Sequence, residues 1–161
     1  MITKFNILFL TLLKIGKIKY APGTIASLFT CLLFLLLINV FDILIIFFCT
    51  LIIFCYSFVA INNSYNTFNT KDPQEIVIDE AVGQMLPLLA IPIYETLYLI
   101  PKVYYCVAAF VLFRLFDIWK PFPINYVDNN TKGAVGIMLD DILAGIYTII
   151  ILTIVFFFLG G

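Results

Sequence analysis

Uncharged apolar stretches divide the chain into candidate membrane-spanning segments. Residues 20–41, 43–61 and 142–161 each contain no charged side chain. Because an α-helix rises about 1.5 Å per residue, roughly 20 apolar residues cross the hydrocarbon core of a bilayer. Asp42, which lies close to Asn39, predicts a tight turn between the first two stretches. The pattern therefore predicts three transmembrane helices.

Two further apolar stretches, residues 81–94 and 103–113, are too short to cross a membrane by themselves. Each can span by extending into a polar flank whose charged residues reach the interface, and a re-entrant hairpin is the alternative. We favour full crossings. At the N-terminus, residues 5–13 form an apolar run that lysines follow rather than precede, which favours an interfacial helix over a signal peptide.

These segments predict one all-α domain over residues 1–161, a multi-pass membrane bundle of about five apolar helices plus an N-terminal interfacial helix. Composition agrees, since 63% of the residues are hydrophobic and 12% are charged, against about 45–50% and 25% in soluble domains. The net charge of −1 excludes a basic field for nucleic acid. The absence of histidine excludes His general bases and most catalytic zinc sites. The four cysteines lie in apolar runs and predict small buried side chains.

Charge placement predicts an orientation. With five crossings, Lys102 falls on one side and most other basic residues on the opposite side, which the positive-inside rule makes cytoplasmic. We therefore expect a membrane protein whose more highly charged face lies on the cytoplasmic side. Eight of the ten acidic residues fall on that same face: Asp72, Glu75, Asp79, Glu80, Asp117, Asp128, Asp140 and Asp141.

The first acidic group begins with residues 72–75, whose Asp-Pro-Gln-Glu order is typical of a capping box at a helix start. A helix starting there places Asp79 and Glu80 about two turns inside it, where capping does not explain them. Ala81 and Gly83 are small enough to let another backbone or a ligand approach closely.

A second acidic pair, Asp140 and Asp141, precedes the last apolar stretch, with Ala144 and Gly145 following. Adjacent carboxylates repel each other unless a cation intervenes. Complementing the helix dipole is the alternative, but one aspartate would suffice for it. Four acids at mid-bilayer would cost roughly 12 kcal/mol, so they lie at the interface, bind a metal, or both. Carboxylates without His or paired Cys predict Mg²⁺, with Mn²⁺ as a substitute.

Basic and hydroxyl side chains provide candidate phosphate contacts. Arg114 and Asp117 are three residues apart on a helix that should end at Lys120, because the residue before a proline avoids the helical region. A helical Arg114–Asp117 ion pair is one interpretation, and phosphate binding by Arg114 and Lys120 is the other. Thr24, with Ser27 one turn later, either caps a helix or contacts phosphate. The glycine-containing loop 131–136 leads toward the second acidic pair and could approach an anion.

Together these motifs resemble the phosphatidylglycerophosphatase A family over roughly residues 20 to 155. The resemblance is carried by Ala21-Pro22-Gly23-Thr24-Ile25-Ala26-Ser27-Leu28, Ile76-Val77-Ile78-Asp79-Glu80 with Gly83, Phe113-Arg114-Leu115-Phe116-Asp117-Ile118-Trp119-Lys120-Pro121-Phe122-Pro123-Ile124, Asp128, and Gly136-Ile137-Met138-Leu139-Asp140-Asp141-Ile142-Leu143-Ala144-Gly145.

The resemblance implies an all-α bundle and a Mg²⁺-dependent phosphatase that converts phosphatidylglycerophosphate, a membrane phospholipid, into phosphatidylglycerol and phosphate. Our mechanistic hypothesis places Asp79, Glu80, Asp140 and Asp141 on one or two Mg²⁺ ions. Asp117 or Asp128 would complete the shell or act as general base. Arg114 and Lys120 would neutralise the phosphoryl group, and Thr24 and Ser27 would contact it.

Two other functions remain as alternatives. A CDP-alcohol phosphotransferase is also rich in carboxylates, but its Asp-Gly signature followed by Ala-Arg is absent from the chain. A cation transporter would use intramembrane acids as an ion path. The predicted bunching of the acids on one membrane face disfavours transport.

Overall fold

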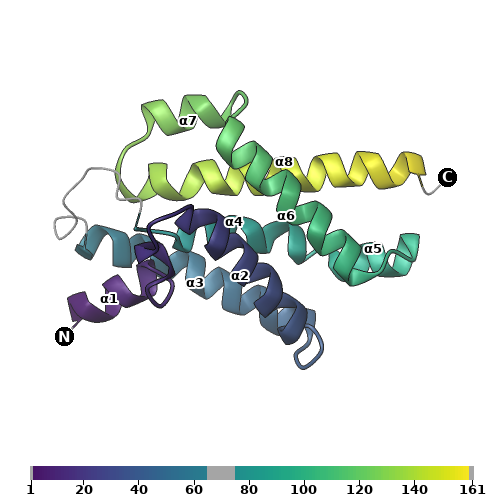
Figure 1. Ribbon diagram of the computed structural model, residues 1–161, viewed down its shortest axis with the longest axis horizontal. Coiled ribbons are helices and arrows are strands. Elements are labelled where there is room, and N and C mark those ends of the chain that lie inside the picture. The colour runs from purple at the N-terminus through teal and green to yellow at the C-terminus, as the bar shows by residue number, and fades with distance from the viewer. Residues whose placement is uncertain (1, 65–74, 160–161) are drawn as a thin grey trace.

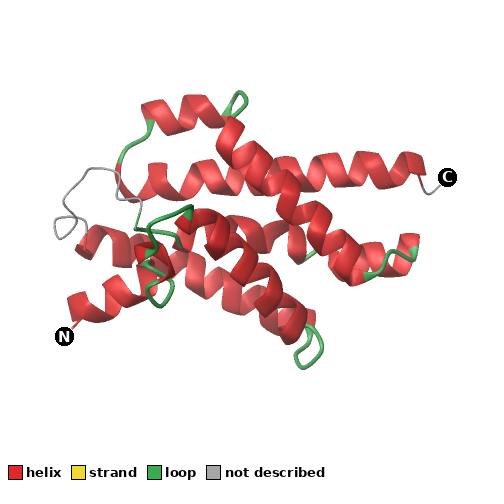
Figure 2. Ribbon diagram, in the orientation of Figure 1, coloured by secondary structure: helices red, strands yellow, loops and turns green. Residues whose placement is uncertain are grey.

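The structure is a computed structural model that describes residues 2–64 and 75–159. In these ranges it is built from helices joined by turns and loops, as Figures 1 and 2 show, which confirms the all-α class. In chain order the elements are α1 (Ile2–Leu10), the short 3₁₀ helix η1 (Ile15–Lys17), α2 (Pro22–Leu37), α3 (Ile43–Ser64), α4 (Ile78–Leu88), α5 (Ile91–Tyr98), α6 (Lys102–Trp119), α7 (Ile124–Asn130) and α8 (Gly133–Leu159).

The short helix α4 occupies the centre of the bundle. It packs against α2, α3, α6 and α8, and its contact with α8 is the most extensive between any two described elements. Most of its side chains are buried as a result. On the far side of α8 lies α7, and α1 packs on α3 (Figure 1).

Two helices, α3 and α8, are long and apolar enough to cross a membrane. Their most apolar windows are 22% and 28% buried, whereas the core helix of a soluble protein is mostly buried. Large apolar side chains such as Leu44, Ile52 and Ile150 therefore project outward. This outward apolar surface is consistent with membrane association. The shorter α2, α4 and α5 do not meet that length alone, so the five predicted crossings stay a prediction.

Four buried hydroxyl groups find acceptors within their own helices. The buried hydroxyls of Ser27, Thr30, Thr50 and Thr148 each donate to the carbonyl four residues earlier, which removes an unpaired donor from the interior. Cysteines follow the prediction in part. Cys31 and Cys106 are buried, but Cys49 and Cys55 are exposed on α3, so their predicted burial is wrong.

Local stereochemistry confirms two predicted boundaries. At the turn between α2 and α3, Asp42 accepts a hydrogen bond from the backbone N–H of Leu44 at 2.9 Å. Helix α6 ends at Trp119, and Lys120 takes a left-handed conformation with φ 47° before Pro121.

Three helix starts differ from the prediction. Helix α4 begins at Ile78 rather than near residue 72, so its acidic pair lies in the first turn and not two turns inside. The backbone N–H of Val77 donates to the carbonyl of Leu10 on α1 at 3.0 Å, which ties the residue before the helix to α1. Glu75 lies in a turn next to Lys17, 4.0 Å away, and residues 71–74 lie outside the described ranges.

Helix α8 begins at Gly133, so most of the predicted loop 131–136 is helical and the second acidic pair lies about two turns inside. At the start of α2, Ala21 occupies the N-cap position and Pro22 the first helical position, so the interpretation of Thr24 as the cap is wrong.

Candidate active site

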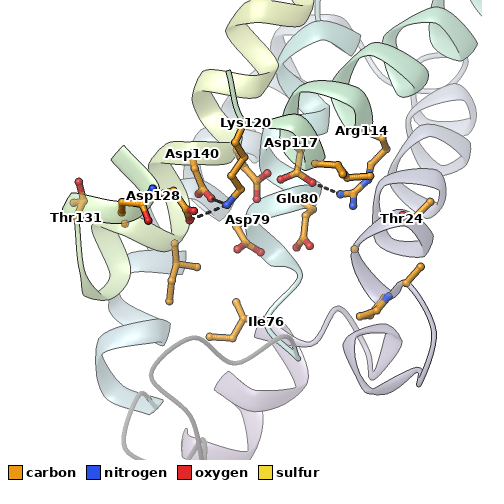
Figure 3. Close-up of a pocket in the computed structure, with 18 of the residues that line it drawn as sticks. Thr24, Ile76, Asp79, Glu80, Arg114, Asp117, Lys120, Asp128, Thr131 and Asp140 are labelled. Atoms are coloured by element: carbon orange, nitrogen blue, oxygen red, sulfur yellow. Dashed lines mark hydrogen bonds and ion pairs between the residues drawn. The ribbon is translucent and has the colours of Figure 1, made fainter. Parts of the chain in front are cut away.

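Four helix ends meet around one cavity of about 730 Å³. Helices α2, α4 and α8 contribute residues near their starts, and α6 contributes residues near its end (Figure 3). The alternating direction of successive helices thus gathers motifs that are far apart in the sequence. Six acidic and four basic side chains line the cavity.

A pair of glycines sets how closely the two acidic helices approach. A Cβ atom added to Gly83 of α4 would lie 2.7 Å from the backbone carbonyl oxygen of Asp141 on α8. A Cβ atom added to Gly145 of α8 would lie 2.5 Å from the carbonyl oxygen of Gly83. Real Cβ atoms essentially never come closer than 3.0 Å, so both positions require glycine. The close approach predicted for these small residues is confirmed.

This approach brings Asp79 and Glu80 of α4 together with Asp141 of α8. One carboxylate oxygen from each residue lies within 4.8 Å of the other two. Oδ1 of Asp79, Oε2 of Glu80 and Oδ1 of Asp141 are buried, and none has a hydrogen-bond partner among the described residues. Three buried oxygens without donors form a site that favours a cation.

Burial and mutual repulsion favour the protonated forms of these carboxylates when no metal ion is bound. Burial raises the pKa of Asp79 well above its ordinary value, and the charges of Glu80 and Asp141 raise it further. Burial also raises the pKa of Glu80, although Arg114 opposes the shift. A cation bound here would replace these protons.

The neighbouring carboxylate Asp140 is engaged differently. Its Oδ2 accepts a hydrogen bond from Lys120 Nζ at 2.8 Å, and the same ammonium donates to Asp128 Oδ1 at 2.7 Å (Figure 3). Burial would lower the pKa of Lys120, but the two carboxylates raise it above its ordinary value. Asp140 thus lies beside the three-carboxylate group and is paired with a lysine.

Arg114 lies on the opposite side of the acids, paired with Asp117 one helical turn away on α6. Its Nε is buried and has no acceptor within the ranges that the structure describes. Gly23 of α2 faces both Arg114 and Glu80, so a side chain at this position would strike the Glu80 carboxylate. This arrangement places the guanidinium of Arg114 and the carboxylate of Glu80 on the same side of Gly23.

Nine of the ten predicted site residues line the cavity: Thr24, Asp79, Glu80, Arg114, Asp117, Lys120, Asp128, Asp140 and Asp141. Ser27 is not among the lining residues. It is fully buried, and its hydroxyl donates to the Gly23 carbonyl at 2.9 Å. The roles proposed for these residues stay predictions.

Two lysines that the sequence reasoning did not assign, Lys19 and Lys132, also line the cavity. Lys19 is one of the lysines that follow the predicted interfacial helix of residues 5–13. Its position three residues before Pro22 of the Ala21–Leu28 motif was the available signal. Lys132 lies in the segment 131–136 that the sequence predicted as a loop, and it immediately precedes the first residue of α8.

Comparison with known proteins agrees with this site. The model of the family Phosphatidylglycerophosphatase A matches residues 8–156. A Phosphatidylglycerophosphatase A from Haemophilus influenzae is 37% identical over 136 residues, 84% of this chain and 79% of the relative. A Bacteroides thetaiotaomicron protein, provisionally named phosphatidylinositol-3-phosphatase, is 33% identical over 148 residues, 90% of this chain and 89% of the relative.

A Phosphatidylglycerophosphatase A from Escherichia coli is 35% identical over 92 residues, 57% of this chain and 49% of the relative. No solved structure matches the chain. The family match covers nearly the whole sequence and includes every residue that lines the cavity. The chain therefore belongs to the phosphatidylglycerophosphatase A family and is a phosphatase.

Proposed function

We propose that this chain is a Mg²⁺-dependent membrane enzyme that hydrolyses phosphatidylglycerophosphate to phosphatidylglycerol and phosphate. One observation carries the proposal: three carboxylates, each with a buried oxygen that has no hydrogen-bond partner among the described residues, converge in the same cavity as Arg114 and Lys120. A metal-ion site beside two basic side chains that can contact phosphate suits the binding of a phosphomonoester. The name of the Haemophilus influenzae relative suggests the substrate.

The residues present fit a divalent cation. When its six acidic side chains are ionised against four basic ones, the cavity repels an anionic substrate unless positive charge is added. Asp79, Glu80 and Asp141 would hold Mg²⁺ through oxygen atoms, the ligands that this ion prefers. Asp140 would support the site from beside it. When bound, the ion supplies charge neutralisation on the phosphoryl oxygens and an acidified water.

The protein's own side chains would position and stabilise the phosphoryl group. Arg114, anchored by Asp117, would place its guanidinium charge against a phosphoryl oxygen. Lys120 would neutralise a second oxygen, and Thr24, near the start of α2, would donate its hydroxyl. Asp117 and Asp128 are the remaining carboxylates that can accept the proton of the attacking water.

We also propose a multi-pass arrangement in the inner membrane with the site on the cytoplasmic face. Helices α2, α3, α6 and α8, with α4 and α5 acting together, run alternately away from and towards the site end. Lys19, Arg114, Lys120 and Lys132 all line the cavity at this end, as the positive-inside rule requires of a cytoplasmic face.

A second substrate, phosphatidylinositol-3-phosphate, is suggested by the name of the Bacteroides thetaiotaomicron relative, whose alignment covers 90% of this chain. Both lipids carry a phosphomonoester on a headgroup that a phosphodiester links to diacylglycerol. The chemistry at the proposed metal site is therefore the same for both, and the choice depends on contacts with the headgroup.

The test is phosphate release by the purified chain in vesicles that contain one lipid or the other. We expect Mg²⁺-dependent release that Asp141→Asn abolishes. Glu95→Gln is the matched control, because Glu95 is an acid on α5 that pairs with Lys102 away from the cavity, and it should retain activity. Release that persists in EDTA would contradict the metal role. Ion flux without hydrolysis would support the transporter alternative.

A further inference from the structure

The cations of the cavity fall into two classes. Arg114 and Lys120 are each paired with a carboxylate. Lys19 and Lys132 line the same cavity and form no ion pair with any acidic side chain in the described parts of the chain. Their charges are therefore available to a ligand.

We infer that Lys19 binds the phosphodiester that links the substrate headgroup to its diacylglycerol. This inference rests on the proposed function. The substrate carries two phosphates. In the proposed function, Arg114 and the metal ion held by Asp79, Glu80 and Asp141 contact only the monoester. The diester keeps a full negative charge at neutral pH, and it needs a separate cation as it leaves water.

The choice of Lys19 over Lys132 follows from their positions. Figure 3 shows Thr24 and Thr131 on opposite sides of the acidic group. Lys19 belongs to the segment that leads into Thr24, and Lys132 directly follows Thr131. The two lysines therefore approach the cavity from different walls.

These walls differ in polarity. Beside Lys19 are the exposed side chains of Ile18 and Tyr20, and the exposed Ile118 of α6 lines the same cavity. The residues within two positions of Lys132 are Asn130, Thr131, Gly133 and the buried Ala134, so no exposed large apolar side chain adjoins this lysine. Because a lipid diester is bonded directly to the acyl-bearing glycerol, it must lie at the apolar wall.

Lys19 is also free to move onto an anion. It is exposed, and its Nζ lies 5.6 Å from the centre of the Tyr20 ring, a weak interaction at a solvated site. With the diester held there, the diacylglycerol would leave the cavity past the exposed Tyr20 side chain. Lys19 then acts as a specificity residue for phosphomonoesters that carry a lipid-linked diester.

The test compares Lys19→Gln with Lys17→Gln in the full chain reconstituted in vesicles. Lys17 lies in the same segment, pairs with Glu75 and does not line the cavity, so it matches the charge change. Two soluble competitors separate the phosphate positions: glycerophosphoglycerol carries the diester, and inorganic phosphate resembles the monoester.

We expect Lys19→Gln to raise the KM for the lipid and the inhibition constant of glycerophosphoglycerol by roughly fivefold to tenfold, which corresponds to the loss of one hydrogen bond at a solvated site. Inhibition by inorganic phosphate and kcat should stay within about twofold, and Lys17→Gln should resemble the native protein.

Equal changes for both competitors, no change for either, or a native enzyme that glycerophosphoglycerol does not inhibit would overturn the role of Lys19. So would a diester-selective effect of Lys132→Gln in place of Lys19→Gln. These failures differ from failure of the proposed function, in which the native chain releases no phosphate from either lipid.

Discussion

The contact between α4 and α8 gives the sharpest prediction, through the substitution Gly83→Ala. The new methyl group would lie 2.7 Å from the backbone carbonyl of Asp141, whereas ordinary contact begins at 3.4 Å. The two backbones must therefore separate by about 0.7 Å at this point. Gly145→Ala demands about 0.9 Å from the opposite helix, because its methyl group would lie 2.5 Å from the Gly83 carbonyl.

A shift of this size matters more to the site than to stability. Overpacking costs about 1–3 kcal/mol, partly offset because alanine favours a helix over glycine by about 1 kcal/mol. A metal or catalytic constellation tolerates only about 0.5 Å. Moving Asp141 away from Asp79 should therefore lower kcat by about 100-fold and raise the Mg²⁺ concentration needed for half-maximal activity.

The assay is Mg²⁺-dependent phosphate release, with thermal unfolding in detergent measured alongside. Leu88→Ala is the control on the same helix, since Leu88 is fully buried away from the cavity. It should lower stability by about 2–5 kcal/mol yet leave the activity per folded molecule intact. Near-native kcat and Mg²⁺ dependence in both glycine variants would refute the argument that this contact sets the metal site.

Two further predictions concern charge. The pKa of Asp79 is raised in the folded, metal-free protein, so the folded state binds this proton more tightly than the unfolded state does. The melting temperature in EDTA should therefore rise as the pH falls towards 3.8, the ordinary pKa of an aspartate. A melting temperature that falls steadily over this range would contradict the prediction. Lys120→Gln leaves Asp140, with 12% of its side chain exposed, without its cation and should cost about 1–3 kcal/mol. Asp128→Asn, at a 38% exposed partner of the same lysine, should cost under about 1 kcal/mol in the same unfolding measurement.

Boundaries fixed by local stereochemistry were predictable from the sequence. The proline after Lys120 ends α6 wherever that helix packs, and the Asp42 side chain can satisfy a nearby backbone N–H without help from the rest of the fold. Apolar length likewise predicted α3, which begins at Ile43 as expected. These features depend on residues that are neighbours in the chain.

Boundaries fixed by tertiary contacts were not predictable in this way. The start of α4 depends on the backbone of Val77 pairing with Leu10, 67 residues earlier in the sequence. Helix α8 starts at Gly133 although glycines are poor helix formers, because Ala134 and Met138 are buried in the same hydrophobic cluster as Leu10 of α1. Neither the hydrophobic periodicity nor the helix propensity of these segments predicts these contacts with α1.

The same distinction explains which acids meet. Successive residues on a helix point about 100° apart, so Asp140 and Asp141 cannot both face α4, and adjacency alone does not choose between them. The glycines do, since Gly83 follows Asp79 by four residues and Gly145 follows Asp141 by four, which places each acid on the face where the helices touch. Glu80 points elsewhere and joins the group because Gly23 of α2 leaves room for its carboxylate. An acid followed by glycine four residues later, on two helices that must pack, therefore predicts the facing pair, and the remaining acid is left to the nearest cation, Lys120.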